Sequence, residues 1–464
     1  MIDIGGEEMQ TKNDFTQGSV GRNIIKLAVP MTVAQLINVL YSVVDRIYIG
    51  RMPGEGKVAL TGLGLTFPIL TIIIAFANLV GMGGAPLSSI ERGKGNNEVA
   101  EKVMGNSFTM LLGLGILLTL IGLLVKKPVL YLFGASEVTF PYADSYIRIY
   151  LLGTVFVMLG LGLNSYINAQ GFAKVGMLSV ILGAVINLIL DPIFIYLFKM
   201  GVEGAAWATV ISQGCSCIWV LRFLRGSQTL LKLKTKNMKL EKTIVTQILG
   251  LGSSGFAMAI TNSSVQIVCN ATLALYGGDL YVGAMTVINS IREVVMMPVQ
   301  GLTNGAMPVI SYNYGAKAYN RVKKGIGFST LTCVIYTTLA WGMVHFFGSF
   351  LIRIFNNEAQ LARIAEPALA VYFFGFFMMS FQFAGQSTFV ALGKSKQAVF
   401  FSIFRKVIIV VPLTLLLPRI GYGVMGVFIA EPISGFVGGI ACYATMLWLV
   451  GKELKGKHEI HVVG

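Results

Sequence analysis

An amide, a carboxylate and a proline lie within six residues of an otherwise apolar stretch, at Asn187, Asp191 and Pro192. On a helix, residues 187 and 191 are four apart and share one face. Proline lacks an N–H and bends a helix, which leaves the carbonyl of Leu188 without its usual partner. A carboxylate, an amide oxygen and a free carbonyl suit a proton or a small hard cation. The alternative is a buried aspartate that only holds helices together.

A second polar series lies between residues 24 and 50, at Gln35, Asn38, Ser42 and Asp45. Its spacings of 3, 4 and 3 residues place these side chains on one stripe of a helix, which needs a wet or polar neighbour. Contacts between helices are the alternative role for such small polar groups. Asn164 and Thr209 are two further polar residues within apolar stretches. The candidate cation-coupling ligands are therefore Asp45, Asn164, Asn187, Asp191 and Thr209.

A third series lies between residues 282 and 312, at Asn289, Glu293, Gln300 and Asn304. A glutamate facing a central cavity would attract organic cations, whereas a paired or protonated structural glutamate is the alternative. We expect the substrate cavity to be lined by Gln35, Asn38, Glu293, Gln300 and Asn304.

The elements that position these residues follow from the composition. Of the 464 residues, 55% are hydrophobic and only 12% are charged, which indicates a polytopic membrane protein. Stretches long enough to cross a bilayer predict twelve helices. They cover about 24–50, 59–85, 103–125, 142–168, 176–198, 202–224, 244–275, 282–312, 325–350, 367–391, 397–417 and 423–450.

The two halves of the chain align at a constant offset of 222 residues. Gly83 falls on Gly305, and Gly153 falls on Gly375. The predicted fold is an all-α membrane protein with two six-helix lobes related by a parallel internal repeat. We expect a tail at 1–23, an N-terminal lobe at 24–224 (helices 1–6), a basic linker at 225–243, a C-terminal lobe at 244–450 (helices 7–12) and a tail at 451–464.

The candidate coupling residues are not repeated in the second half. Their equivalents under the offset are Ile267, Gln386, Ile409, Leu413 and Glu431. Residues needed only for packing would be expected in both halves, because both share one fold. The asymmetry favours a proton or cation site in the N-terminal half alone.

The basic residues give the orientation. The net charge is +15, and one set of loops, with both tails, holds 23 of the 36 Lys and Arg residues against eight in the opposite loops. By the positive-inside rule, both termini are cytoplasmic and the chain is a multi-pass protein of the cell membrane. The location of this charge in loops argues against nucleic acid as a partner.

The sequence offers no enzyme chemistry. It has no HExxH or GxSxG motif and no Cys/His cluster, and the phosphate-loop-like Gly393-Lys394-Ser395 lacks the upstream glycine because Thr388 stands there. We therefore expect a transporter without a cofactor, driven by H⁺ or Na⁺ and acting as a monomer on small organic cations among membrane lipids.

Several motifs together resemble the multidrug and toxic compound extrusion (MATE) family, in particular its bacterial DinF-like and MepA-like members. They are Pro30 with Val44-Asp45, Asn187-x-x-x-Asp191-Pro192, Gly201-Val202-x-Gly204-Ala205-Ala206-x-Ala208-Thr209, and the paired loop glycines Gly93 and Gly315. The resemblance covers roughly residues 20–450.

The resemblance implies two lobes in a V and multidrug efflux of cationic, amphipathic compounds in exchange for H⁺ or Na⁺. It implies a cation site in the N-terminal lobe, where Na⁺ would be held by Asp45, Asn187, Asp191 and Thr209. The competing hypothesis is a lipid-linked oligosaccharide flippase of similar architecture, which would need a cationic cavity built from Arg292, Arg405 and Lys406. A channel is disfavoured by the inexact repeat, whereas an uptake symporter stays open.

Overall fold

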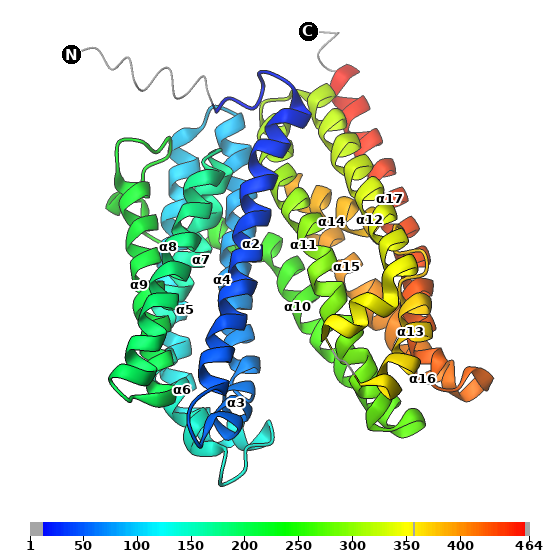
Figure 1. Ribbon diagram of the computed structural model, residues 1–464. Coiled ribbons are helices and arrows are strands. Elements are labelled where there is room, and N and C mark those ends of the chain that lie inside the picture. The colour runs from blue at the N-terminus through cyan, green and yellow to red at the C-terminus, as the bar shows by residue number, and fades with distance from the viewer. Residues whose placement is uncertain (1–12, 356–357, 460–464) are drawn as a thin grey trace. The chain divides into compact units, whose positions relative to one another are not determined.

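The computed structural model describes residues 13–355 and 358–459, and every regular element among them is a helix (Figure 1). The chain divides into two compact units. The first unit is Met1–Phe15 with Val29–Gly252, and the second unit is Thr16–Ala28 with Ser253–Gly464. The predicted all-helical fold with two repeated halves is confirmed, whereas the lobe boundaries at 24–224 and 244–450 remain a prediction.

The first unit holds the helices coloured from blue to green in Figure 1. They are α2 (Val20–Gly50), α3 (Gly56–Gly64), α4 (Phe67–Gly93), α5 (Asn97–Leu132), α6 (Phe140–Leu152), α7 (Thr154–Ala169), α8 (Ala173–Pro192) with the π-helix η1 (Ile193–Leu197), and α9 (Gly201–Arg225). The short 3₁₀-helix η2 (Thr235–Asn237) lies in the linker.

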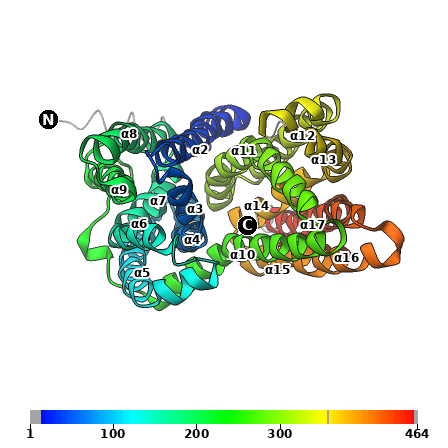
Figure 2. The ribbon, with the colours of Figure 1, turned by 60° about the horizontal axis from the view of Figure 1, so that its bottom comes forward.

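The second unit holds the helices coloured from green to red, which Figure 2 shows from another side. They are α10 (Lys242–Gly277), α11 (Asp279–Gly315), α12 (Tyr319–Phe355), α13 (Ala359–Tyr372), α14 (Met378–Ala391), α15 (Ser395–Ile403), η3 (Phe404–Val410), α16 (Val411–Leu416), η4 (Pro418–Tyr422) and α17 (Met425–Glu459). The π-helix η3 continues α15 and contains two of the basic residues discussed below.

Within the described residues, ten helices are long and apolar enough to cross a membrane, and the bent pair α6 and α7 makes an eleventh span. The pair bends by 57°. The expected span 367–391 is likewise divided into α13 and α14. Its break contains Gly375 with a φ of +67°, which glycine adopts without steric cost. The equivalent glycine under the offset, Gly153, lies at the α6–α7 break.

The first helix of each half crosses the division between units. Helix α2 begins in the second unit and enters the first after Ala28, while α10 begins in the first unit and enters the second after Gly252. Glycines permit the close crossings: a Cβ built on Gly83 of α4 would lie 2.7 Å from the backbone nitrogen of Gly252. The equivalent Gly305 of α11 would meet the nitrogen of Ala28 at 2.6 Å. Small residues allow such backbone-to-backbone packing in membranes.

Candidate functional site

Two aspartates meet inside the first unit. Asp45 lies on α2 and Asp191 near the end of α8, and their carboxyl groups lie within hydrogen-bonding reach of each other. Asp191 is fully buried and Asp45 is 8% exposed. Asn187, one turn earlier on α8, donates from Nδ2 to Asp191 Oδ1 over 3.2 Å. The i, i+4 spacing seen in the sequence thus places the amide and the carboxylate in direct contact.

Three buried oxygens of this pair of helices lack a hydrogen-bond donor among the described residues. They are Asp45 Oδ1, Asn187 Oδ1 and Asp191 Oδ2. A buried acceptor without a donor costs free energy, and two ionised carboxylates side by side cost more. A proton or a metal cation between the carboxyl groups removes both penalties. The arrangement is therefore suited to holding a small cation.

Three further side chains complete the surroundings. The buried Tyr146 of α6 makes a hydrogen bond with Thr209 of α9. It lies close enough to Asp45 for the charge of that carboxylate to act on its hydroxyl. Tyr41 of α2 makes hydrogen bonds with Ser42 and Gln213 and also lies near Asp45. Thr209 itself donates to the carbonyl of Ala205 over 3.0 Å.

The sequence analysis missed Tyr41, Tyr146 and Gln213. Tyr41 is four residues before Asp45, and Gln213 is four residues after Thr209, so helical spacing was a usable signal for both. Tyr146 had no such signal, because no candidate ligand lies within one helical turn of it in the sequence.

A cavity of about 200 Å³ lies beside this cluster in the first unit, with room for about six waters. Its polar lining is neutral: Gln35, Asn38, Tyr41, Asn78, Asn164, Asn168, Ser179, Ser212, Gln213 and Ser216. Tyr41 and Gln213 line the cavity and are hydrogen-bonded to each other, and Tyr41 also lies near the carboxylates of Asp45 and Asp191. The structure therefore places the stripe residues Gln35 and Asn38 at a polar cavity.

Asn164 belongs to the wall of this cavity. Its Nδ2 donates to the carbonyl of Gly176 over 3.0 Å and to Ser179 Oγ over 2.7 Å, while its Oδ1 accepts from Asn168 over 3.0 Å. These bonds tie α7 to α8. Asp45, Asn187, Asp191 and Thr209 are grouped separately, so Asn164 is the one expected ligand that the structure places elsewhere.

The remaining substrate-cavity candidates lie on α11 in the second unit. Glu293 and Gln300 are exposed, and Asn304 is half-buried. Glu293 acts electrostatically on the neighbouring Arg292. These three residues and the pair Gln35 and Asn38 belong to different units, so their role in a common cavity remains a prediction.

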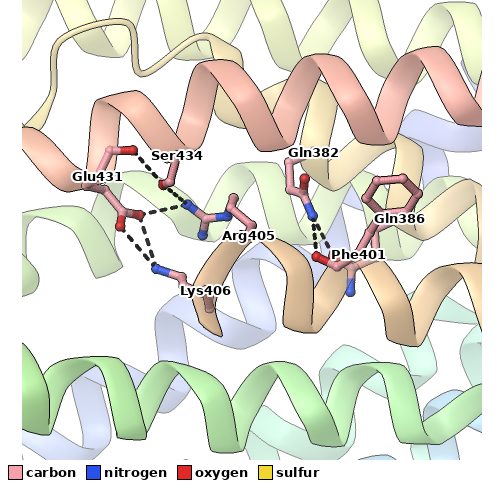
Figure 3. A network of polar contacts seen from close by, with 7 residues as sticks. All are labelled: Gln382, Gln386, Phe401, Arg405, Lys406, Glu431 and Ser434. Carbon is pink, nitrogen blue, oxygen red and sulfur yellow. Dashed lines mark hydrogen bonds and ion pairs between the residues drawn. The ribbon is translucent and has the colours of Figure 1, made fainter. Parts of the chain in front are cut away.

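A polar network lies inside the second unit, where the sequence predicted no coupling site (Figure 3). Arg405 and Lys406 of η3 point toward Glu431 of α17, and Arg405 also reaches Ser434. Nearby, Gln382 Nε2 donates to the carbonyl of Phe401 over 3.2 Å. Glu431, equivalent to Thr209 under the offset, is thus an ion-pair partner of two cations.

The described residues contain no group of three His, Cys, Asp or Glu side chains that would hold a transition metal. The donors of the first-unit cluster are two carboxylates, an amide and a hydroxyl. Oxygen ligands of this kind fit a hard monovalent cation. The oxygens of Asp45, Asn187 and Asp191 that lack a hydrogen-bond donor are available to coordinate such an ion.

Comparison with known proteins gives consistent results. The family model MatE matches residues 30–193 and 255–416, once in each half. The chain is 26% identical to the multidrug export protein MepA of Staphylococcus saprophyticus over 399 residues, which are 85% of this chain and 87% of that protein. It is 24% identical to MepA of Staphylococcus haemolyticus over 434 residues, covering 93% and 95%.

Solved structures share the fold. An outward-facing multidrug resistance MATE family transporter of the MOP superfamily superposes with a TM-score of 0.88 at 22% identity, covering 96% of this chain and 98% of that one. A MATE structure in the bent conformation gives 0.90 at 22% identity, covering 98% and 99%. A MOP superfamily transporter from Pyrococcus furiosus, described as having a binding pocket of reverse polarity, gives 0.89 at 22%, covering 95% and 98%.

Proposed function

Because this chain belongs to the MatE family, we propose that it is a secondary active multidrug efflux transporter. In this proposal it exports cationic, amphipathic compounds in exchange for H⁺ or Na⁺ by alternating access. The observation that carries the proposal is the set of three buried acceptor oxygens without a donor, on Asp45, Asn187 and Asp191. The relatives named multidrug export protein support the export of drugs.

The cluster would act as a charge-controlled contact between two helices. With the ion bound, the carboxyl groups of Asp45 on α2 and Asp191 on α8 attract each other through it. When the ion leaves, both carboxylates carry charge in a buried place, and their repulsion favours a different position of α2. A cation that binds one arrangement better than the other shifts the balance between them. Pro30 provides a point at which α2 can bend.

The side chains around the carboxylates define how the ion would be held. Asn187 keeps Asp191 oriented through the bond to its Oδ1, which leaves Oδ2 for the ion. Tyr146 links Thr209, its hydrogen-bond partner, to Asp45, whose charge acts on the Tyr146 hydroxyl. Carboxylate, amide and hydroxyl oxygens accept Na⁺ and also surround a proton on a carboxylate, so the donor set supports either coupling ion.

The orientation completes the proposal. We place both termini in the cytoplasm and the chain in the cell membrane, because the cytoplasmic loops would then carry the excess of Lys and Arg. We also propose that the protein works as a monomer.

The test is efflux of a fluorescent organic cation from vesicles that contain the purified protein, with a pH gradient and a Na⁺ gradient imposed separately. We expect one gradient to drive efflux, and Asp191→Asn to lower the initial rate by about 10- to 100-fold. Asp144→Asn is the matched control, because Asp144 lies at an outer end of α6, paired with Lys126. Efflux at the wild-type rate in Asp191→Asn, or no efflux under either gradient, would refute the proposal.

The flippase hypothesis rests on the basic residues of the second unit. Arg405 is 5% exposed and Lys406 4%, and both are bonded to Glu431. A site for a large anionic lipid needs cations on an accessible wall. The burial of these residues disfavours the flippase, and an assay with a lipid-linked oligosaccharide in the same vesicles separates the two functions.

A further inference from the structure

The ion network of the second unit has a well-defined centre. Arg405 Nη1 donates to Glu431 Oε1 over 2.9 Å and to Ser434 Oγ over 3.3 Å. Lys406 Nζ donates to Glu431 Oε1 over 3.1 Å and to Oε2 over 3.3 Å. Figure 3 shows these contacts. Glu431 is 7% exposed and Ser434 is fully buried, so the contacts are shielded from solvent.

A third cation approaches the same carboxylate. The charge of Arg292, on α11, acts on Glu431, and Tyr372 of α13 lies close to both. Arg292 is half-buried, and its Nε is a buried donor without a hydrogen-bond partner among the described residues. Cys269 of α10 completes the neighbourhood and carries no formal charge.

The charges in this cluster do not balance. Three cations, Arg292, Arg405 and Lys406, share the carboxylate of Glu431. Among the described residues, the only other carboxylate that acts on Arg292 is the exposed Glu293. In formal charges, three cations therefore face two carboxylates, of which only Glu431 is buried. Uncompensated charge at membrane depth is costly and is normally balanced by a partner.

The repeat shows that this charge is particular to the second half. Under the 222-residue offset, Arg405 and Lys406 correspond to Gly183 and Ala184, which line the neutral cavity of the first unit. The second unit thus places two long basic side chains where the first unit has a hollow. Apolar side chains such as that of the nearby Ile409 would be sufficient if these positions served packing only.

We propose that the cluster of Arg292, Arg405 and Lys406 around Glu431 binds a compact monovalent anion. The unpartnered Nε of Arg292 supplies a donor, and the excess positive charge supplies the attraction. Arg292 is half-buried, whereas Arg405 and Lys406 are buried, so Arg292 is the most exposed of the three cations. The anion is a halide from solution or the carboxylate of a transported compound, because both present one negative charge to the guanidinium. This site is independent of the proposed cation coupling.

The test is thermal unfolding of the purified protein in detergent at constant Na⁺ and ionic strength, with the bulky sulfonate camphorsulfonate replaced stepwise by chloride or by acetate. We expect a saturable rise in Tm of about 3 °C with at least one of the two anions. Arg292→Gln should abolish the rise, because it removes the free donor and leaves the contacts of Arg405 and Lys406 with Glu431 intact. Arg148→Gln should keep it, because Arg148 forms only an exposed ion pair with Glu203.

Comparing chloride with acetate shows which class of anion the site binds. A rise with chloride alone assigns the site to halides, whereas a rise with acetate assigns it to carboxylates as well. A Tm that is the same in camphorsulfonate, chloride and acetate overturns the proposal, and so does a full rise in Arg292→Gln. If Arg292→Gln unfolds, bromide and bromoacetate soaked separately into crystals of the unaltered protein decide. An anomalous peak beside Arg292 Nε with either anion supports the site, and no peak there with both overturns it.

Discussion

The crossing of α4 and α10 predicts a strong effect of a single methyl group. A Cβ added to Gly252 would lie 2.6 Å from the carbonyl carbon of Leu79 and closer still to its oxygen. Carbon atoms in contact are about 3.5–4.0 Å apart, so the two backbones must separate by about 1 Å. Backbone atoms cannot rotate away as a side chain can. We expect Gly252→Ala to destabilise the first unit by about 2 kcal/mol, typical of overpacking.

The matched control lies one turn further along the same helix. No heavy atom of the described chain lies within 4 Å of a Cβ built on Gly255. Gly255→Ala should therefore be neutral or stabilising by about 0.5–1 kcal/mol, because alanine has the higher helix propensity. Thermal unfolding in detergent measures both: Tm should fall by about 4–8 °C in Gly252→Ala and stay level or rise in Gly255→Ala.

The comparison of these two alanine variants is decisive. Both place the same methyl group on one helix, so helix propensity and hydrophobicity change equally. Equal Tm values for Gly252→Ala and Gly255→Ala would show that the backbones at this crossing are not in close contact. The packing argument would then be wrong.

Two further predictions concern the buried networks. Glu431→Gln removes the carboxylate that two cations contact, so it should lower stability by about 3–5 kcal/mol, and adding Lys406→Met should recover part of this loss in the same unfolding assay. Tyr146→Phe removes the hydroxyl bonded to Thr209, which is worth about 1 kcal/mol, and should raise the ion concentration for half-maximal efflux about fivefold with little change in Tm. An unchanged ion dependence would exclude Tyr146 from the coupling site.

The helices and the repeat could be predicted from the sequence because both depend on local patterns. Apolar length defines a span, and a constant offset defines the repeat without any knowledge of contacts. The contact between Asn187 and Asp191 was predictable for the same reason, since four residues make one helical turn. The approach of Asp45 to Asp191 was a weaker inference, because it depends on how α2 packs on α8.

The sequence analysis grouped Arg292, Arg405 and Lys406 as the basic residues that a flippase would need, but it did not predict their arrangement around Glu431. The members of this network come from α11, η3 and α17, and no spacing relates Arg292 to residues more than a hundred positions later. Nothing in the sequence indicated that the side chains of the consecutive residues Arg405 and Lys406 both contact the carboxylate of Glu431. Asn164 illustrates the opposite problem, because an amide at a suitable depth proved to be bonded to α8.

The passage of α2 and α10 between the units has a consequence for the origin and the assembly of the chain. The beginning of the first helix of each half belongs to the other unit. There the beginning of α10 packs against Gly83, and the beginning of α2 packs against the equivalent Gly305. Exchange of the same element between two copies is the geometry of a domain-swapped dimer. The protein thus has the organisation of a swapped homodimer joined into one chain. Two fragments cut within the 226–241 linker should each lack a helix start, and co-expression should let them supply it to each other.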